Sequence, residues 1–213
     1  YIREDLMQKL VDKADFYTMC DKYGIRHPKT VVLDAPAEAD TLTADKLGFA
    51  YPIIVKPSSS IDYWHHPFDG MKKVYTADTP AEAAQIVAEI YNAGYTERMI
   101  LQDRIEGTDA NMRVLTAYVG KDGKVKMMCL GHVLLEEHTP KGLGNHAAII
   151  TEYNPELTAK FRALLEAIGY RGFANFDIKY DDRDGTLNVF EINLRQGRSN
   201  YYITSSGLNI AKY

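Results

Sequence analysis

The feature that most constrains this chain is a pair of strand-like runs near its C-terminal end. The runs FANFDIKY (173–180) and TLNVFEIN (186–193) flank the turn-forming segment DDRDG, so they predict a β-hairpin. Side chains on a strand alternate between two faces, so Glu191 and Asn193 point the same way. A five-residue connection from Asp182 to Thr186 would set Asp177 directly opposite Glu191.

Two carboxylates that face each other call for a positive partner. Like charges directly opposite across a ladder destabilise it by a few tenths to about 1 kcal/mol. With Asn193, the carboxylates of Asp177 and Glu191 form an all-oxygen donor set. Such a set suits Mg²⁺, which proteins hold with one or two carboxylates plus phosphate oxygens and water. The same pattern fits an exposed hairpin face neutralised by Lys179, and the hairpin alone leaves both interpretations open.

Two further features favour a phosphate site. Arg195 and Arg198 follow the hairpin directly, and guanidinium is the preferred fork for phosphate or carboxylate. Lys56 ends the apolar strand PIIVK and precedes a serine-rich loop that contains Ser58 and Ser59. A lysine there can place a point charge on phosphate, with serine hydroxyl and backbone donors nearby. The alternative for Lys56 is a strand-end side chain that extends its ammonium into water.

Composition narrows the class of protein. The chain has 213 residues, 46% of them apolar, and a net charge of -4, so we expect a folded core and no nucleic-acid partner. No apolar run approaches the length of a membrane span, and the N-terminus does not resemble a signal peptide. Cys20 and Cys129 lack metal-type spacing, which predicts a cytoplasmic protein without disulfides. The start at Tyr1 and the helix-like ending NIAKY suggest a fragment of a longer protein.

Three helices are predicted from apolar periodicity and end signals. The first covers roughly residues 4–23 and stops at Gly24. The second begins with the capping box at Thr79, and the third begins at Asn154 followed by proline. Strands are expected at 30–33, 52–56, 71–75, 99–104, 111–119 and 124–135, in addition to the hairpin. The pattern predicts an α+β fold with antiparallel pairs, divided near residue 104 into the lobes 1–104 and 105–213.

In this order, the motifs resemble those of the ATP-grasp ligases, from about Lys13 to the end of the chain. YPIIVKPSSS resembles the strand whose lysine grips the ATP phosphates, together with the mobile phosphate loop. MILQDRIEGTDANMRV resembles the segment between the lobes that reads adenine and ribose, and the hairpin resembles the magnesium site. EINLRQGRS is similar to the corresponding run of carbamoyl-phosphate synthase large subunits. The spacing most resembles carboxylate–amine ligases such as D-aspartate ligase, an enzyme of cell-wall metabolism.

The resemblance implies two α+β lobes that grip ATP, and a role for each matching residue. The implied nucleotide-binding residues are Lys13, Lys56, Ser58, Ser59, Gln102, Asp103, Arg104, Ile105 and, on the ribose, Asp109. The implied ligands of Mg²⁺, or of Mn²⁺ in its place, are Asp177, Glu191 and Asn193. Arg195 and Arg198 match arginines near the transferring phosphate or the substrate carboxylate.

The chain departs from the family's pattern in two places. D-alanine–D-alanine ligases carry an arginine where this chain has Asn175, which argues against that substrate pair. The phosphate loop SSSIDYWHHPFDG is poor in glycine; Trp64, His65 and His66 either shield the site from water or pack locally. His138 and His146 lie in a glycine-containing stretch and are interpreted as solvated loop residues.

The implied activity is ATP-dependent ligation of a small-molecule carboxylate to an amine through an acylphosphate, with release of ADP and phosphate. The protein would act by positioning and electrostatics. A kinase on the same scaffold, which would stop at a phosphorylated product, remains an alternative. A nucleotide-binding sensor without turnover is another. The resemblance leaves the substrates and the oligomeric state open.

Overall fold

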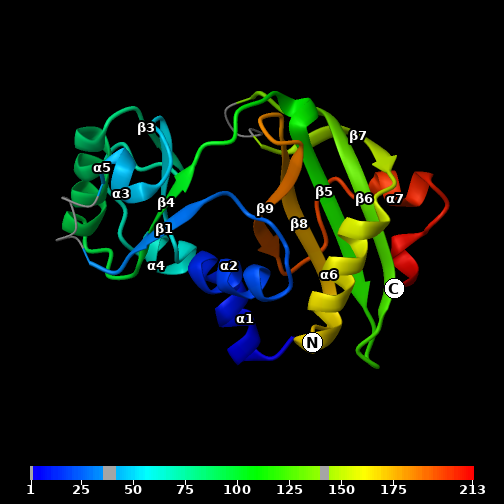
Figure 1. The fold of residues 1–213 in the computed structure, drawn as a ribbon. Coiled ribbons are helices and arrows are strands. Elements are labelled where there is room, and N and C mark those ends of the chain that lie inside the picture. Colours follow the sequence, from blue (N-terminus) through cyan, green and yellow to red (C-terminus); the bar gives the residue numbers. More distant parts are fainter. Residues whose placement is uncertain (1, 36–41, 140–143) are drawn as a thin grey trace. The chain divides into compact units, whose positions relative to one another are not determined.

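The computed structural model describes residues 2–35, 42–139 and 144–213, and the chain divides into two compact units. The four-stranded unit comprises Val11–Tyr17 and Pro28–Arg104. The five-stranded unit comprises Tyr1–Leu10, Thr18–His27 and Ile105–Tyr213. Both combine helices with antiparallel sheets (Figure 1), so the predicted α+β class is confirmed.

The four-stranded unit is built on an antiparallel sheet in the order β1-β4-β2-β3. Its strands are β1 (Thr30–Leu33), β2 (Ile53–Pro57), β3 (Tyr75–Ala77) and β4 (Met99–Asp103). Its helices are α3 (Ala44–Leu47), α4 (Ser60–His65) and α5 (Pro80–Asn92). The apolar face of α5, formed by Ala83, Val87 and Ile90, packs into one core cluster with Ile53, Val55 and Met99 from the sheet.

Local signals set the helix ends in both units. Thr79 caps α5 by accepting a hydrogen bond from the Glu82 N–H, and Pro80 takes the first helical position. Asn154 caps α6 (Pro155–Ala167) in the same way through the Leu157 N–H. A side-chain oxygen at this position satisfies one of the unpaired N–H groups of the first turn, so both predicted helix starts are confirmed.

The five-stranded unit contains an antiparallel sheet in the order β7-β6-β5-β8-β9. Its strands are β5 (Met112–Val119), β6 (Val125–Glu136), β7 (His146–Glu152), β8 (Gly172–Asp181) and β9 (Thr186–Asn193). The other elements are α1 (Glu4–Val11), α6, α7 (Tyr201–Ser205), the C-terminal part of α2 (Lys13–Lys22), and the short 3-10 turns η2 (Asp109–Asn111) and η3 (Ile210–Lys212).

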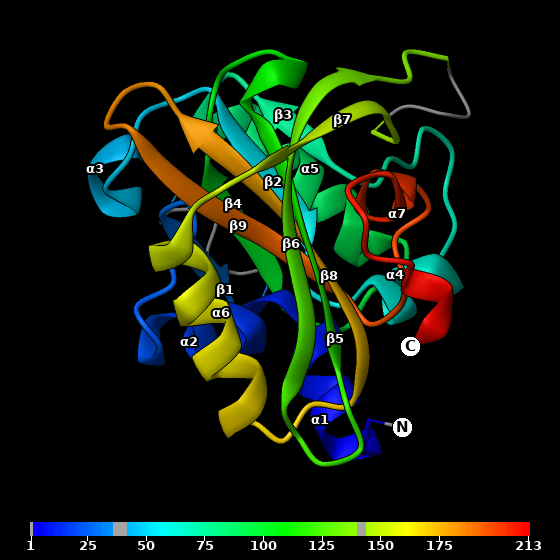
Figure 2. The same ribbon diagram turned by 90° about the vertical axis from the view of Figure 1, so that its right-hand side faces the viewer.

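Each face of this sheet has its own cover (Figure 2). Phe176 of β8 contacts Phe161 of α6, with ring centroids 4.4 Å apart. Its neighbour Asn175 points to the other face because strand side chains alternate, and on that face Tyr202 of α7 packs against Val114 of β5. The polar side chains of the β8–β9 hairpin therefore share a face with α7 and not with the apolar core under α6.

The structure corrects the predicted first helix. Residues 4–23 form two helices, α1 and α2, separated at Asp12. The Asp12 carboxylate accepts hydrogen bonds from the Asp15 N–H (3.0 Å) and from Ser58 Oγ (2.8 Å). It also pairs with Arg98 at 2.7 Å. An aspartate that binds the backbone three residues ahead acts as a helix start, which explains why one periodic pattern became two helices.

One predicted strand differs in the structure, and one strand was not predicted. Residues 71–74 are not in a strand, and β3 begins only at Tyr75, whose hydroxyl accepts the Lys72 N–H (2.9 Å) and lies 2.7 Å from the Tyr63 hydroxyl. Strand β7, HAAIITE, was not among the predicted strands, and only its first residue, His146, had been assigned, to a loop. Its pairing with β6 places His146 opposite Glu136. Across the described ranges, no helix is both long and apolar enough to span a bilayer.

Candidate functional site

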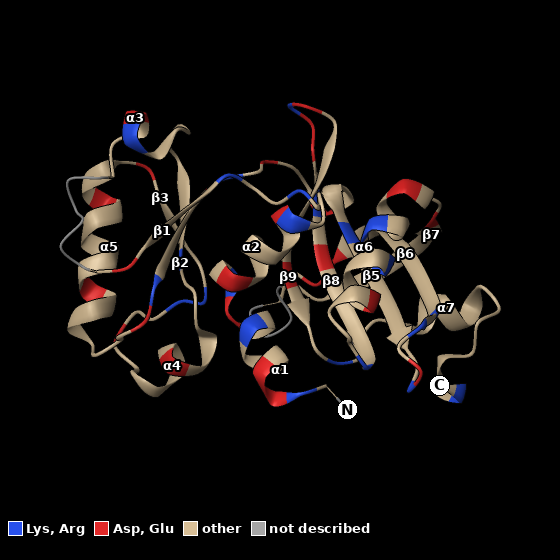
Figure 3. Cartoon of the chain, turned by 60° about the horizontal axis from the view of Figure 1, so that its bottom comes forward, with Lys and Arg blue, Asp and Glu red and all other residues tan. Residues whose placement is uncertain are grey.

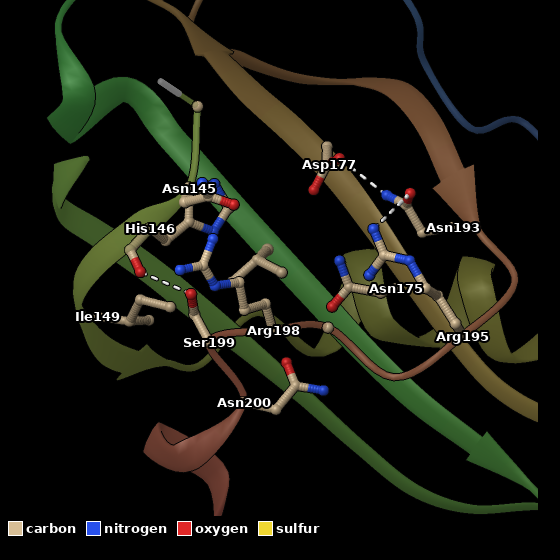
Figure 4. A pocket seen from close by; sticks show the side chains of 13 residues that line it. Asn145, His146, Ile149, Asn175, Asp177, Asn193, Arg195, Arg198, Ser199 and Asn200 are labelled. Atoms are coloured by element: carbon tan, nitrogen blue, oxygen red, sulfur yellow. Dashed lines mark hydrogen bonds between the residues drawn. The ribbon is translucent and has the colours of Figure 1, made fainter. Parts of the chain in front are cut away.

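The β8–β9 hairpin brings the predicted metal ligands together. Its register pairs Asp177 with Glu191 and Asn175 with Asn193, so the two carboxylates stand directly opposite each other as predicted. A register shift follows Asp177. Asn193 Nδ2 donates to Asp177 Oδ2 at 3.0 Å (Figure 4). Figure 3 shows acidic positions on both strands of this hairpin.

These residues fit a hard cation by their chemistry. Two half-buried carboxylates and an amide supply only oxygen ligands, the set that Mg²⁺ prefers. In this structure the Asn193 amide presents its nitrogen to Asp177, and its oxygen lies 3.4 Å from Arg195 Nη2. No group of three or more His, Cys, Asp and Glu side chains suited to a metal occurs within residues 2–35, 42–139 and 144–213. The predicted site holds only two such side chains, so its metal ligands stay a prediction.

A small cavity of about 90 Å³ opens beside the hairpin. Its wall includes Asp177, Asn193, Arg195 and Arg198, so four of the predicted site residues are brought together (Figure 4). Both arginine side chains are exposed, and Arg195 Nη1 donates to the Gln196 carbonyl oxygen at 3.2 Å. The rest of the wall is polar and uncharged apart from a few apolar groups: Val114, Gly144, Asn145, His146, Ile149, Asn175, Gly197, Ser199 and Asn200.

In the four-stranded unit, Lys56 is buried and not extended into water. Only 6% of its surface is exposed. Its Nζ lies 2.9 Å from Gln102 Oε1 and 3.1 Å from the Tyr17 hydroxyl, and it approaches the Tyr17 ring. The Gln102 amide in turn donates to Thr30 Oγ1 at 2.8 Å. The structure thus joins two predicted nucleotide-binding residues, Lys56 and Gln102, through a direct hydrogen bond across the β2–β4 pair.

Hydrogen bonds give the serine-rich loop a structural task, and its phosphate-binding role stays a prediction. Ser58 is fully buried; its hydroxyl donates to Asp12 and accepts the Ala14 N–H at 3.2 Å. Ser59 caps α4 through the Asp62 N–H. Lys13 Nζ donates to Ser60 Oγ at 3.1 Å, which places the two predicted phosphate-binding segments side by side. Hydrogen bonds therefore already hold Ser58 and Ser59 in the loop.

The aromatic loop is partly helical. Tyr63, which the sequence did not single out, is its buried anchor and packs edge-on against Tyr95 with ring centroids 6.0 Å apart. Trp64 is 58% exposed. His66 lies 3.5 Å from Asp62, whose other oxygen accepts the Thr96 N–H at 3.2 Å. The loop thus packs through Tyr63, while Trp64 and His65 stay at the surface.

The predicted linker residues lie at the junction of the two units in sequence. Gln102, Asp103 and Arg104 end the four-stranded unit and Ile105 begins the other. The Asp103 N–H donates to the Lys29 carbonyl oxygen at 2.9 Å. Asp109 accepts from the Glu136 N–H (2.9 Å) and lies 2.8 Å from His138 Nε2. These two hydrogen bonds, the backbone one first, lower the pKa of the Asp109 carboxyl.

His146 was missed because it was interpreted as a solvated loop residue. It lies in β7, its side chain is 9% exposed, and it lines the cavity. Burial lowers the pKa of its imidazole. Burial also raises the pKa of Glu136, whose Oε1 is 3.5 Å from His146 Nε2, with a smaller contribution from the Asp109 charge. His138, by contrast, is exposed but contacts Asp109, which ties it to the predicted ribose-binding residue.

The sequence is similar to those of known ligases. No protein-family model matches the chain. It is 45% identical over all 213 residues to D-aspartate ligase of Enterococcus faecium, and the match covers 51% of that enzyme. It is 26% identical over 201 residues to the carbamoyl phosphate synthase large chain of Deinococcus deserti, covering 92% of this chain and 18% of that one. The chain therefore spans about half of the first relative's length and a fifth or less of the second's.

Solved structures share its backbone arrangement. The biotin carboxylase domain of Hydrogenobacter thermophilus 2-oxoglutarate carboxylase, crystallised with MgADP and bicarbonate, superposes with a TM-score of 0.72. That comparison has 17% sequence identity and covers 98% of this chain and 45% of the other. D-alanyl-alanine synthetase A of Vibrio cholerae superposes with a TM-score of 0.69 at 15% identity, covering 96% and 62%. The ATP-grasp ligase PsnB gives 0.59 at 16% identity, covering 94% and 55%.

The chain has the ATP-grasp fold. The resemblance of its motifs to ATP-grasp carboxylate–amine ligases is likewise confirmed, since the D-aspartate ligase similarity extends over the whole sequence. The ATP-grasp structures show which architecture these residues adopt. They leave the role of each residue in this chain as a prediction.

Proposed function

We propose that this chain is the ATP-grasp part of a ligase that joins a carboxylate to an amine through an acylphosphate and releases ADP and phosphate. The observation that carries the proposal is the β8–β9 hairpin. It pairs Asp177 with Glu191, adds Asn193, and opens onto a cavity walled by Arg195 and Arg198. The 45% identity to D-aspartate ligase supports the same reaction class.

Asp177, Glu191 and Asn193 would hold Mg²⁺, or Mn²⁺ in its place. The bound ion supplies positive charge to the phosphate oxygens of ATP. The facing carboxylates of Asp177 and Glu191 create the negative potential that attracts such an ion, and β8 and β9 fix them on a rigid ladder. Structures with the same fold were crystallised with ADP or MgADP, which supports ATP and Mg²⁺ as the bound nucleotide and ion.

The four-stranded unit and the segment that follows it in sequence would hold the nucleotide. Lys56 carries a buried ammonium, whose charge interacts more strongly with phosphate than an exposed one would. Gln102 accepts a hydrogen bond from that ammonium and fixes its direction. Lys13 and the Ser59 hydroxyl would add donors to the phosphates, and Ser58, whose hydroxyl donates to Asp12, would hold the loop in place. Asp103, Arg104 and Ile105 are proposed to read the adenine edge and Asp109 the ribose.

Arg195 and Arg198 would act on the carboxylate that is activated. Both guanidiniums are exposed on the cavity wall (Figure 4), where they can bind a phosphate or carboxylate in bidentate fashion. They would neutralise charge as the carboxylate attacks phosphorus and as phosphate departs. An acidic amino acid is the first candidate substrate, because two guanidinium groups can bind two carboxylates. The similarity to D-aspartate ligase supports the same candidate. A role in cell-wall metabolism is proposed on that similarity alone.

The test is a panel of amino acids and amines given to the full-length protein, with ADP release as the readout. The ligase account predicts ADP release that requires both a carboxylate and an amine. It also predicts a hydroxamate when hydroxylamine replaces the amine. A stable phosphorylated product without amine dependence would replace the proposal with a kinase. Absence of ADP release across the panel, with ATP still bound, would replace it with a nucleotide sensor.

A further inference from the structure

Three buried polar side chains meet in the wall of the cavity. Thr116 of β5 is fully buried, and Asn175 of β8 and Asn200, just before α7, are 5% and 3% exposed. Thr116 is the register partner of Asn175. Its Oγ1 lies 2.8 Å from Asn175 Oδ1 and 3.1 Å from Asn200 Oδ1. Because burying polar groups is costly unless each finds a partner, such a cluster requires an explanation.

The cluster is not satisfied by its own members. A hydroxyl carries one proton, so Thr116 can donate to only one of the two amide oxygens at a time. Asn200 Nδ2 is buried and has no partner among the described residues. Turning the Asn200 amide by 180° would pair this nitrogen with Thr116 and leave the oxygen unpaired instead. In either orientation, a buried amide group is available for a further partner.

The positions of the oxygens determine where the Asn175 amide nitrogen points. Both amide oxygens lie against Gly197, where an added Cβ would collide with Asn175 Oδ1 and would be 2.6 Å from Asn200 Oδ1. The Asn175 nitrogen is on the opposite side of its planar amide, toward Asp177 (Figure 4). It forms no hydrogen bond with any residue that the structure describes. The cluster therefore presents an N–H₂ donor to the cavity.

The location of this donor limits what it can bind. Asn175 pairs with Asn193 across the ladder and shares a strand face with Asp177, two residues on. A group that reaches this nitrogen is therefore next to the proposed metal ligands. The cavity volume of about 90 Å³ admits a carboxylate-sized group but not a nucleoside. A neutral donor suits an oxygen whose negative charge grows during the reaction.

We infer that Asn175 donates a hydrogen bond to the acyl oxygen of the activated carboxylate, and that Thr116 and Asn200 are positioning residues that aim it. When the amine attacks the acylphosphate carbon, the carbon–oxygen π electrons move onto that oxygen. These electrons re-form the carbon–oxygen double bond when the bond from the acyl carbon to the phosphate oxygen breaks and phosphate leaves. The amine loses a proton to solvent. Asn175 stabilises the oxygen during the interval. The inference rests on the proposed ligase function.

The test compares Thr116→Val with Thr116→Ser in the full-length protein. Valine keeps the shape of threonine without the hydroxyl, whereas serine keeps the hydroxyl. Losing a correctly oriented hydrogen-bond donor lowers kcat by about 10²–10³-fold. Disturbing only the orientation of the Asn175 amide should therefore lower kcat by about tenfold to a hundredfold. We expect that loss in Thr116→Val, with KM for ATP unchanged within about twofold, and recovery in Thr116→Ser. Thr151→Val, an exposed change on β7 of the same sheet, is the control.

Each outcome decides the matter. Equal kcat in Thr116→Val and Thr116→Ser would overturn the inference while leaving the ligase function intact. Wild-type protein without carboxylate-dependent ADP release would overturn the proposed function and the inference with it. If Thr116→Val does not fold, as judged by its unfolding temperature, Asn200→Ala decides instead. That variant removes one neighbour of Thr116, and an unchanged kcat there would also overturn the inference.

Discussion

Replacing Gly197 by alanine would test how tightly the cavity wall is built. Gly197 lies between the predicted arginines, and an added Cβ would collide with Asn175 Oδ1 and come within 2.6 Å of Asn200 Oδ1. Neither amide can simply swing away. Asn175 is on the inner strand β8, and its oxygen and that of Asn200 lie 2.8 Å and 3.1 Å from the Thr116 hydroxyl, which donates to one of them at a time. The loop after β9 or the amides must shift.

The expected cost follows from overpacking. Forcing an extra methyl into a well-packed buried site costs about 1–3 kcal/mol. For a chain of 150–250 residues, each kcal/mol lowers Tm by roughly 2–4 °C. Gly197→Ala should therefore lower Tm by roughly 2–12 °C. Turnover should fall as well, since the shift displaces the Asn175 amide, while affinity for ATP should stay near the wild-type value because Lys56 and Gln102 are unaffected.

The assay is thermal unfolding, measured by scanning calorimetry. Gly120→Ala is the matched control. A Cβ at Gly120 would be 2.8 Å from Asp122 Oδ1 and 2.9 Å from Lys126 Cε. Both atoms belong to exposed side chains that can move aside, so the control should stay within about 0.5 kcal/mol of wild type. Equal Tm values for the two variants would show that the cavity wall around Gly197 can accept a methyl group without cost. That result would refute the packing argument.

Three further changes test other parts of the structure. Lys56→Met should weaken ATP binding by about tenfold to a hundredfold, on the scale of a charged hydrogen bond, and leave adenosine binding unchanged in calorimetry; equal losses for both would contradict a phosphate contact. Asp12→Ala should lower the free energy of unfolding by about 1–3 kcal/mol, because it removes the cap of α2 and the partner of Ser58, and urea denaturation that shows no loss would disprove the capping. Because burial raises the pKa of Glu136, its ionisation opposes folding, so Glu136→Gln should be more stable than wild type at about pH 7 and lose that advantage as the pH falls to about 4; denaturation at both pH values measures this, and a constant difference would contradict the shift.

What the sequence revealed depended on how local each signal was. Helices α5 and α6 start at Thr79 and Asn154 as expected, because each cap and its target N–H are three residues apart. The turn segment predicted the β8–β9 hairpin, but the pairing of Asp177 with Glu191 also depends on a register shift between Asp177 and Ile178. The break at Asp12 also has a local cap, through the Asp15 N–H, but the Asp12 carboxylate is held by Ser58 and Arg98 as well, and these are distant in sequence. Apolar periodicity carries no information about such partners.

The remaining site residues had no local pattern to reveal them. HAAIITE, the β7 segment, contains two alanines and follows a glycine-containing stretch, so its strand character depends on pairing with β6. His146 became buried only through that pairing. Thr116, Asn175 and Asn200 come from three separate elements, and their contact exists only once the sheet and α7 are assembled. Resemblance of motifs indicated the residues expected to bind ATP and metal, but not the side chains that orient their neighbours.

The central claim is that the β8–β9 hairpin serves carboxylate activation, and hydroxylamine trapping tests it most directly. The full-length protein is given ATP, Mg²⁺, an acidic amino acid and hydroxylamine, and hydroxamate is measured against Mg²⁺ concentration for wild type, Glu191→Gln and Asp184→Asn. Asp184 lies in the turn of the same hairpin, bonded to Arg26 and Thr186, so it controls for loss of a carboxylate. We predict hydroxamate from wild type and Asp184→Asn and none from Glu191→Gln. Undiminished hydroxamate from Glu191→Gln at limiting Mg²⁺ would contradict the account.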